Sequence, residues 1–116
     1  SPHTIGKDQT LERASQVMRQ HGIRHLPVLD GGQLLGIVST RDVYLVETLR
    51  DVDPTKVTVE EAMSAEPYAV APDAALKEVV EEMERKKYGA AVVMEGRKVA
   101  GIFTTIDALR VLAAKL

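Results

Sequence analysis

Two short stretches of the chain place a hydroxyl and a carboxylate three residues apart, directly after an apolar run. They are Ser39 with Asp42 in GIVSTRD, and Thr104 with Asp107 in GIFTTID. At the start of a helix the hydroxyl caps the first turn and the carboxylate faces the positive end of the helix dipole. The same arrangement suits a ligand, because a carboxylate can accept the hydroxyls of a ribose. Amides at a helix start can also hold phosphate.

Three cationic side chains lie close to these stretches in the sequence. Arg24 and His25 precede an apolar run, and Arg41 lies inside GIVSTRD. A guanidinium can donate to two phosphate oxygens at once, so phosphate contact is one interpretation. The other is that both arginines are solvated and that His25 fills a half-buried strand position. The residues alone leave both open.

The positions of the histidines and of Ser39 in the sequence disfavour metal binding and serine catalysis. His21 and His25 have the separation of a helical zinc pair, but Gly22 breaks the helix between them and no third ligand is nearby. Ser39, Asp42 and His25 include the residue types of a catalytic triad, yet no Gly-x-Ser-x-Gly turn surrounds the serine. We therefore expect neither a metal site nor a catalytic residue.

Composition narrows the class of protein. The 116 residues are 45% apolar and 28% charged, the formal net charge is −2, and there is no cysteine. That charge gives no basic surface for a nucleic-acid backbone. The absence of cysteine excludes disulfides and thiolate chemistry and suits a reducing cytosol. The longest strongly apolar stretch, around residues 90–94, is far shorter than the ~20 residues of a membrane helix, and no signal-peptide pattern begins the chain. We expect a cytoplasmic protein.

The chain repeats itself at an offset of 65 residues. The offset pairs, among others, Leu11 with Leu76, Met18 with Met83, Gly36 with Gly101 and Asp42 with Asp107. One supersecondary unit therefore occurs twice. Each half is too small to bury a comfortable fraction of its surface alone, so the halves are expected to need each other.

Both copies predict the same elements. Apolar residues at helical spacing indicate amphipathic helices, the first over residues 11–21 and ending at Gly22, the second from Leu76 through Met83. Short apolar runs at 25–29 and 34–38, and at 90–94 and 99–103, bracket glycine-containing turns and predict hairpins. Further helices are expected over 40–49 and 105–115, with brief strands at 4–5 and 69–70. Thr58 is expected to cap a short helix within 57–63.

At this point the residues resemble a known family, the CBS domain, in tandem. The resemblance rests on IRHLPV at 23–28 before a glycine turn, on GIVSTRD and GIFTTID, and on Ala62-Met63-Ser64 with Pro67 ahead of the second copy. It implies an α+β fold of two β-α-β-β-α repeats with pseudo-twofold symmetry, two small three-stranded sheets packed together and helices outside. We place repeat 1 at residues 1–50, a linker with a short helix at 51–61, and repeat 2 at 62–116.

The copies also differ. Val92 replaces the Pro27 equivalent, and Gly89-Ala90 replace Arg24-His25, so the two halves need not bind one ligand equally. The first copy begins at Ser1-Pro2 without a counterpart of Met63-Ser64, and we expect residues upstream of it to be missing.

The resemblance implies a regulatory module that binds adenosine compounds such as AMP, ADP, ATP or S-adenosylmethionine in clefts between the repeats, with no catalysis and no required cofactor. In that arrangement Arg24 and His25 contact the phosphates of a nucleotide whose ribose lies on Asp107. Asp42 faces Tyr68, Ala69 and Ala90 of the other repeat. The full set of expected binding residues is His3, Thr4, Arg24, His25, Leu26, Ser39, Arg41, Asp42, Tyr68, Ala69, Gly89, Ala90, Thr104, Ile106 and Asp107.

A different class of function fits the same sequence. The repeats could form a ligand-independent assembly module, a homodimer whose outer helices pair with those of a second chain. Leucines available for that interface are Leu45, Leu49, Leu109, Leu112 and Leu116. The sequence does not identify a regulated partner protein.

Overall fold

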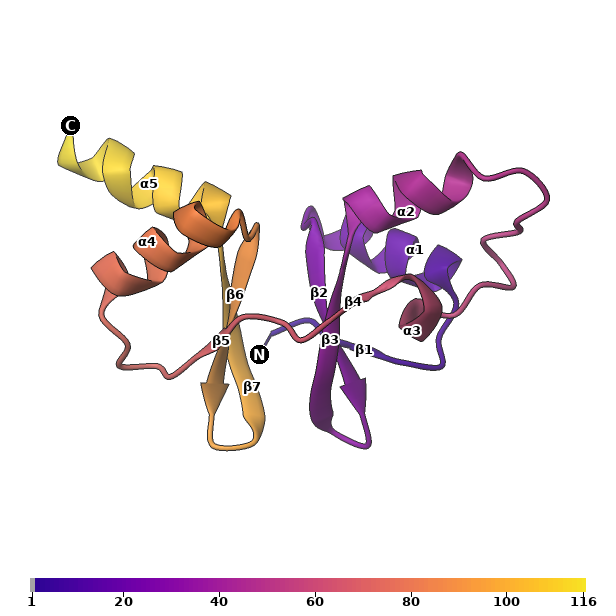
Figure 1. The fold of residues 1–116 in the computed structure, drawn as a ribbon, viewed down its shortest axis with the longest axis horizontal. Helices are drawn as coiled ribbons and strands as arrows, with labels where there is room; N and C mark the ends of the chain where they lie inside the picture. The colour runs from indigo at the N-terminus through magenta and orange to yellow at the C-terminus, as the bar shows by residue number, and fades with distance from the viewer. Residues whose placement is uncertain (1) are drawn as a thin grey trace. The chain divides into compact units, whose positions relative to one another are not determined.

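The computed structural model describes residues 2–116 in two compact units (Figure 1). The first unit is His3–Pro67, and the second is Tyr68–Leu116 together with Pro2. Ser1, with which the first copy of the repeat begins, lies outside the described residues. These two units are defined by contacts within the structure. The limits 1–50, 51–61 and 62–116 were drawn instead from the repeat in the sequence, and they stay a prediction.

The first unit contains one sheet and three helices. Along the chain it runs β1 (Ile5–Gly6), α1 (Leu11–His21), β2 (His25–Asp30), β3 (Gln33–Ser39), α2 (Thr40–Glu47), α3 (Val59–Ala62) and β4 (Ser64–Ala65). The sheet has the order β1-β2-β3-β4, with β1 parallel to β2 and the other pairs antiparallel. The expectation of three strands was wrong for this unit, because β4 adds a fourth at the β3 edge.

The second unit repeats the pattern with one strand fewer. It runs β5 (Ala69–Val70), α4 (Leu76–Lys86), β6 (Ala90–Glu95), β7 (Lys98–Thr104) and α5 (Thr105–Lys115), and its sheet has the order β5-β6-β7. The α+β class and the repeated β-α-β-β-α order are therefore confirmed. The helix expected over 40–49 ends earlier, at Glu47, with Thr48 as its C-cap.

Local chemistry explains where the long helices begin and end. Thr10 caps α1, its Oγ1 accepting from the amide of Arg13 at 3.1 Å. Gly22 ends α1 in the left-handed conformation with φ 63°, as predicted for a glycine just past a helix. The matching position after α4 is Lys87, whose φ of 59° costs a residue with a Cβ more than it costs glycine. Thr58 caps α3, also as predicted.

Each hairpin turns through two residues between antiparallel strands. Gly31 and Gly32 both have positive φ, 57° and 84°, which suits the tight turn that follows the twist of the strands. The register pairs His25 with Ser39 in the first hairpin and Ala90 with Thr104 in the second. Both ladders shift register at corresponding places, between Val28 and Leu29 and between Val93 and Met94, so the two hairpins share their irregularity as well as their length.

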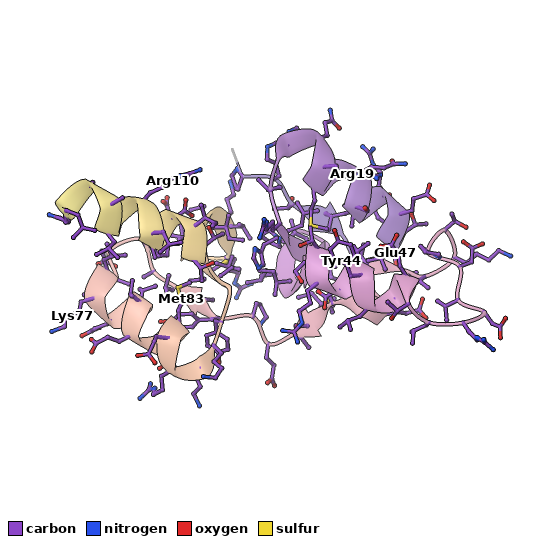
Figure 2. All side chains as sticks on the ribbon, turned by 90° about the horizontal axis from the view of Figure 1, so that it is seen from above. Arg19, Tyr44, Glu47, Lys77, Met83 and Arg110 are labelled. Carbon is purple, nitrogen blue, oxygen red and sulfur yellow. The ribbon has the colours of Figure 1, made fainter. Side chains whose placement is uncertain are left out.

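Each unit has its own aliphatic core. The first gathers Leu11, Met18, Leu26, Val28, Val38 and Val59 with less than 2% of each exposed, whereas the cluster of the second consists of Val79, Met83 and Ala91. Met18 and Met83 are both buried, as expected for core filling. Polar residues such as Lys77 and Arg110 extend from the outer surfaces of α4 and α5 (Figure 2). No helix in residues 2–116 is long and apolar enough to cross a membrane.

Candidate functional site

The first candidate site lies where β3 ends and α2 begins. Asp42 Oδ2 accepts from the backbone amide of Ser39 at 2.8 Å and from its hydroxyl at 3.1 Å. In return Ser39 Oγ accepts from the amide of Asp42 at 3.4 Å. The pair forms a capping box, in which hydroxyl and carboxylate satisfy each other's helix-start amides.

The second unit builds the same arrangement from Thr104 and Asp107. Asp107 Oδ2 accepts from the Thr104 amide at 2.8 Å and from its hydroxyl at 3.0 Å, and Thr104 Oγ1 accepts from the Asp107 amide at 3.4 Å. The two boxes agree in every bond to within 0.1 Å, so GIVSTRD and GIFTTID encode one local structure.

The neighbouring strand starts are tied to these helix starts. In the first unit the amide of Thr40 donates to the carbonyl of Arg24 at 3.0 Å. In the second the amide of Thr105 donates to the carbonyl of Gly89 at 3.2 Å. Each hairpin thus brings its predicted entry residues beside its own capping box. His25 lies close enough to Asp42 for the carboxylate to act on its charge.

The capping boxes leave specific polar groups for a ligand. Both hydrogen bonds from Ser39 to the Asp42 side chain are accepted by Oδ2, which leaves Oδ1 outside the box. Of the first-turn amides of α2, those of Thr40 and Asp42 have partners, so the amide of Arg41 is the one open among the described residues. In α5 the amides of Thr105 and Asp107 have partners, and that of Ile106 has none within residues 2–116. There Asp107 Oδ1 also meets a cation, Arg110 Nη1 at 3.5 Å.

His25 is electrostatically the most perturbed group of the first site. Burial lowers the pKa of His25 below its ordinary value of 6.5, and Arg24 lowers it further, while Asp42 opposes both by raising it. Because burial is the largest cause, the imidazole favours its neutral form. An anion bound beside it would favour the protonated form.

The remaining predicted residues divide between the two units. His3, just ahead of β1, stacks on His21 with ring centroids 3.7 Å apart, Thr4 precedes β1, and Leu26 is buried in β2. In the second unit Tyr68 stacks on Tyr88 at 5.2 Å, and Ala69 pairs with Val92. Tyr88 was not predicted from the sequence, because it contacts Tyr68 across the whole of α4, which separates the two residues along the chain.

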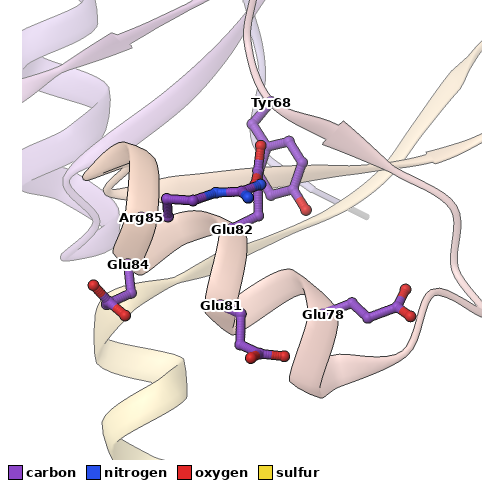
Figure 3. A pocket seen from close by; sticks show the side chains of 6 residues that line it. All are labelled: Tyr68, Glu78, Glu81, Glu82, Glu84 and Arg85. Carbon is purple, nitrogen blue, oxygen red and sulfur yellow. The ribbon is translucent and has the colours of Figure 1, made fainter.

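Two hollows occur on the helices of the second unit. One lies along α4 and is lined by Tyr68, Arg85 and four glutamates, Glu78, Glu81, Glu82 and Glu84, with Arg85 paired to Glu82 (Figure 3). All the charged residues except half-buried Glu82 are exposed, so this surface is a solvated helix face and its negative charge disfavours phosphate. The other is a groove of about 480 Å³ between α4 and α5, lined mostly by apolar residues including Val80, Tyr88 and Leu109.

Nothing in the described part of the chain assembles a metal-binding cluster. No group of three or more histidine, cysteine, aspartate or glutamate side chains is close enough to hold an ion in residues 2–116. His21 ends α1, and Gly22 separates it from His25 on β2.

The fold and the paired capping boxes define a class of protein, a tandem of two β-α-β-β-α repeats that each present a carboxylate at a helix start. The model of the CBS domain matches residues 1–46 and 59–114. The chain therefore belongs to the CBS domain family, and the resemblance stated from the sequence is confirmed.

Three relatives illustrate the range of this family. Inosine-5'-monophosphate dehydrogenase of Korarchaeum cryptofilum is 34% identical over 105 residues, but these are 90% of this chain and only 21% of that enzyme. Hypoxic response protein 1 of Mycobacterium tuberculosis is 30% identical over 107 residues, 91% of this chain and 75% of that protein. A crystal structure of Hypoxic Response Protein I, 30% identical to this chain with a TM-score of 0.79, has two coordinated zinc ions. The CBS domain pair of protein MJ0100, solved with 5'-methylthioadenosine and S-adenosyl-L-methionine, has a TM-score of 0.90 and 25% identity, covering 100% of this chain and 91% of that one.

Proposed function

We propose that this chain is a regulatory module that binds an adenosine compound, such as AMP, ADP, ATP or S-adenosylmethionine, and performs no chemistry on it. The observation that carries the proposal is the twofold occurrence of one capping box with a helix-start amide left open and one carboxylate oxygen outside the box, which in Asp107 also meets Arg110. The adenosine ligands of the MJ0100 domain pair support the choice of ligand class.

The open groups match the parts of such a ligand. Asp42 or Asp107 accepts the ribose hydroxyls through the oxygen that the capping box does not use. The open amide of Arg41 or Ile106 donates to phosphate, as helix-start amides do. Arg24 and His25 contact the phosphate of the nucleotide whose ribose lies on Asp107. Arg41 contacts the phosphate of the nucleotide whose ribose lies on Asp42. That assignment across the repeats is the sequence-based prediction, carried forward here as part of the proposal.

Regulation follows from differential binding. A nucleotide that contacts both repeats favours the conformation in which it binds more tightly, and it shifts the equilibrium only by that difference in affinity. The regulated target is either a further domain of the same protein or a separate partner. We propose that it acts in the cytoplasm, where adenosine nucleotides are the available signal.

The serine hydroxyl is poorly placed for catalysis. A nucleophilic serine needs a base that takes its proton, whereas the Ser39 hydroxyl donates to the capping carboxylate of Asp42 at 3.1 Å. His25 lies opposite Ser39 in the β2–β3 register, but among residues 2–116 the Ser39 hydroxyl donates its proton to Asp42 and not to the imidazole. This arrangement favours binding over bond cleavage.

Isothermal titration calorimetry tests the proposal directly. The purified chain is titrated with AMP, ADP, ATP and S-adenosylmethionine, with cytidine monophosphate as a control that keeps ribose and phosphate but changes the base. We expect saturable binding of at least one adenosine compound and weaker binding of the control. Absence of binding by all four adenosine compounds at millimolar concentration would refute the proposal.

A second candidate function is assembly without a ligand. Large apolar side chains are exposed on the two outer helices, among them Leu45 at 57% and Leu49 just after α2, and Leu109 at 57% and Leu112 on α5. Isologous pairing of such helices makes a homodimer. Sedimentation velocity of the chain, with Leu45→Glu and Leu109→Glu as variants, distinguishes this function. A stable dimer that binds none of the adenosine compounds would establish assembly instead of sensing.

A further inference from the structure

All three histidines of the chain lie in the first unit. His21 is the last residue of α1, His25 is the first residue of β2, and His3 stacks on His21 with ring centroids 3.7 Å apart. Histidine is the side chain whose ordinary pKa puts its change of charge between pH 5 and 8. The residue type that titrates near neutral pH is therefore confined to one of the two units.

The surroundings of His25 differ from those of the other two histidines. His3 and His21 are exposed, whereas His25 is half-buried. The side-chain hydrogen bonds at this helix start join Ser39 to Asp42 and leave the imidazole of His25 without a partner among residues 2–116. No fully buried side-chain nitrogen in those residues lacks a hydrogen bond. The ring nitrogens of His25 therefore reach solvent while part of the ring is covered, and a ligand can meet them there.

Two charges of opposite sign act on the imidazole. Burial, the largest effect, lowers the pKa of His25, Asp42 raises it and Arg24 lowers it again. The Asp42 carboxylate is already engaged by the capping box, since its Oδ2 accepts from both the amide and the hydroxyl of Ser39. His25 is thus held neutral beside a carboxylate whose hydrogen bonds go elsewhere.

The other elements around β2 add cations but no carboxylate that acts on His25. Neither β1 nor β3 contains an ionisable side chain. The last turn of α1 has Arg19 and His21, and the first turn of α2 has Arg41 beside Asp42. Asp42 is the one carboxylate in residues 2–116 that acts on His25. An anion that binds here meets mainly positive neighbours, and it favours the charged imidazolium.

The second unit offers no equivalent group. Ala90 has the register position of His25, and Gly89 that of Arg24. The capping boxes themselves are the same in both units. An anion at the start of β6 would therefore meet no histidine, so at most one proton per chain can accompany binding through this group.

We propose that anion binding at the start of β2 is coupled to protonation of His25, so that the first unit binds phosphate-bearing adenosine compounds more tightly as the pH falls. The inference rests on the proposed nucleotide binding and adds a dependence on pH to it. An anion beside His25 raises its pKa, and between the free and the bound pKa the complex takes up a proton. Affinity therefore increases as the pH falls through that range, up to tenfold for each unit by which binding raises the pKa.

Calorimetry of proton uptake tests this coupling. AMP, or ATP if AMP does not bind, is titrated in two buffers of different ionisation enthalpy near pH 6.5. The phosphate itself titrates near pH 6, so the comparison is with His25→Gln, in which that contribution is unchanged. We expect the wild-type chain to take up roughly 0.3–1 proton more per nucleotide than His25→Gln. His21→Gln is the matched control and should behave as the wild type.

The affinity itself gives a second readout. Relative to the Kd of His25→Gln, the Kd of the wild-type chain should rise about threefold or more between pH 6 and pH 8. Adenosine, which lacks the phosphate, should show no such difference between the two proteins. Urea unfolding checks that each variant is folded across the pH range.

NMR of the histidine ring signals tests the anion site in the unchanged chain. The signals are followed from pH 8 to 5 in sodium sulfate and in sodium chloride of equal ionic strength, which removes the effect of screening. We expect sulfate to move the titration midpoint of the His25 signal to higher pH. The exposed His21 provides the internal reference.

The results separate this inference from the proposed function. Nucleotide binding with equal proton uptake by the wild-type chain and His25→Gln, or an equal loss of uptake in His21→Gln, would overturn the coupling and leave nucleotide binding intact. If no adenosine compound binds, the proposed function fails and the sulfate titration alone decides the anion site. In that case an unmoved His25 midpoint would overturn the inference as well.

Discussion

Replacing the two capping aspartates one at a time distinguishes the two proposed nucleotide sites. We expect Asp107→Ala to weaken AMP binding more than Asp42→Ala does. The reason is that Arg24 and His25 are proposed to contact the phosphate of the nucleotide whose ribose lies on Asp107. The site on Asp42 has only Arg41 as its proposed phosphate cation. Truncating the aspartate of the tighter site removes more of the measured affinity.

The expected size follows from the geometry. Each carboxylate has one oxygen in its capping box. Asp107 Oδ1 also lies 3.5 Å from Arg110 Nη1, and 34% of the Asp107 side chain is exposed. Hydrogen bonds to a charged acceptor contribute about 1.5–3 kcal/mol, or roughly 10- to 150-fold in affinity. Partial exposure favours the lower end, so we expect about a tenfold rise in Kd for Asp107→Ala. Loss of the cap costs a further ~0.5–2 kcal/mol of unfolding free energy.

The assay separates these two effects. Calorimetry with AMP gives the affinity of each variant, and urea unfolding checks that the variant is folded at the assay temperature. Asp73→Ala is the matched control, because Asp73 is exposed in the second unit and lies outside both capping boxes. Equal losses at the two sites, or a larger loss for Asp42→Ala, would refute the ranking. A change below about twofold in both variants would refute the ribose role itself.

Three further measurements test the electrostatics and the packing. Rising salt should weaken AMP binding but not adenosine binding, since only the phosphate is held by Arg24; parallel salt curves would contradict that contact. Because burial holds the pKa of His25 below 6.5, its neutral form is favoured on folding. Its contribution to the unfolding free energy is therefore complete above pH 6.5 and is lost as the pH falls through the folded pKa. Urea unfolding from pH 8 to 5 should show this slope, and His25→Gln should flatten it; an unchanged slope would argue against the assignment. Finally, Leu11→Ala should lower the unfolding free energy by ~2–5 kcal/mol, and Leu76→Ala by less than half as much, because Leu76 is 44% exposed. Equal losses in urea unfolding would contradict the difference in packing.

The exposed leucines bear on assembly. Leu45 and Leu109 belong to the alternative function, in which two chains pair.

Most of the local structure could be predicted from the sequence. The repeat at 65 residues, the helix end at Gly22, the cap at Thr58 and the glycine turns all depend on residues within a few positions of one another. Ser39 with Asp42 predicted a helix start capped by the hydroxyl, which is confirmed, and the structure adds the return bond from the Ser39 amide to Asp42. Such features are determined by backbone preferences and short-range hydrogen bonds, which the order of residue types expresses directly.

The features that the sequence did not provide all depend on contacts between distant residues. The two-residue strand β4 is too short for a periodic pattern, and it exists because its backbone meets β3. The contact of Tyr68 with Tyr88 requires α4 to return the chain to the same place. Leu11 and Leu76 are identical in type and in repeat position, yet only Leu11 is buried.

The sequence by itself therefore determined the repeated unit, its elements and the chemistry at each helix start, because these follow from neighbouring residues. Only the tertiary structure decided that the two copies differ in what covers them. Burial depends on which distant segment packs on a face, and the same glycine is sterically required at position 36 but unopposed at position 101.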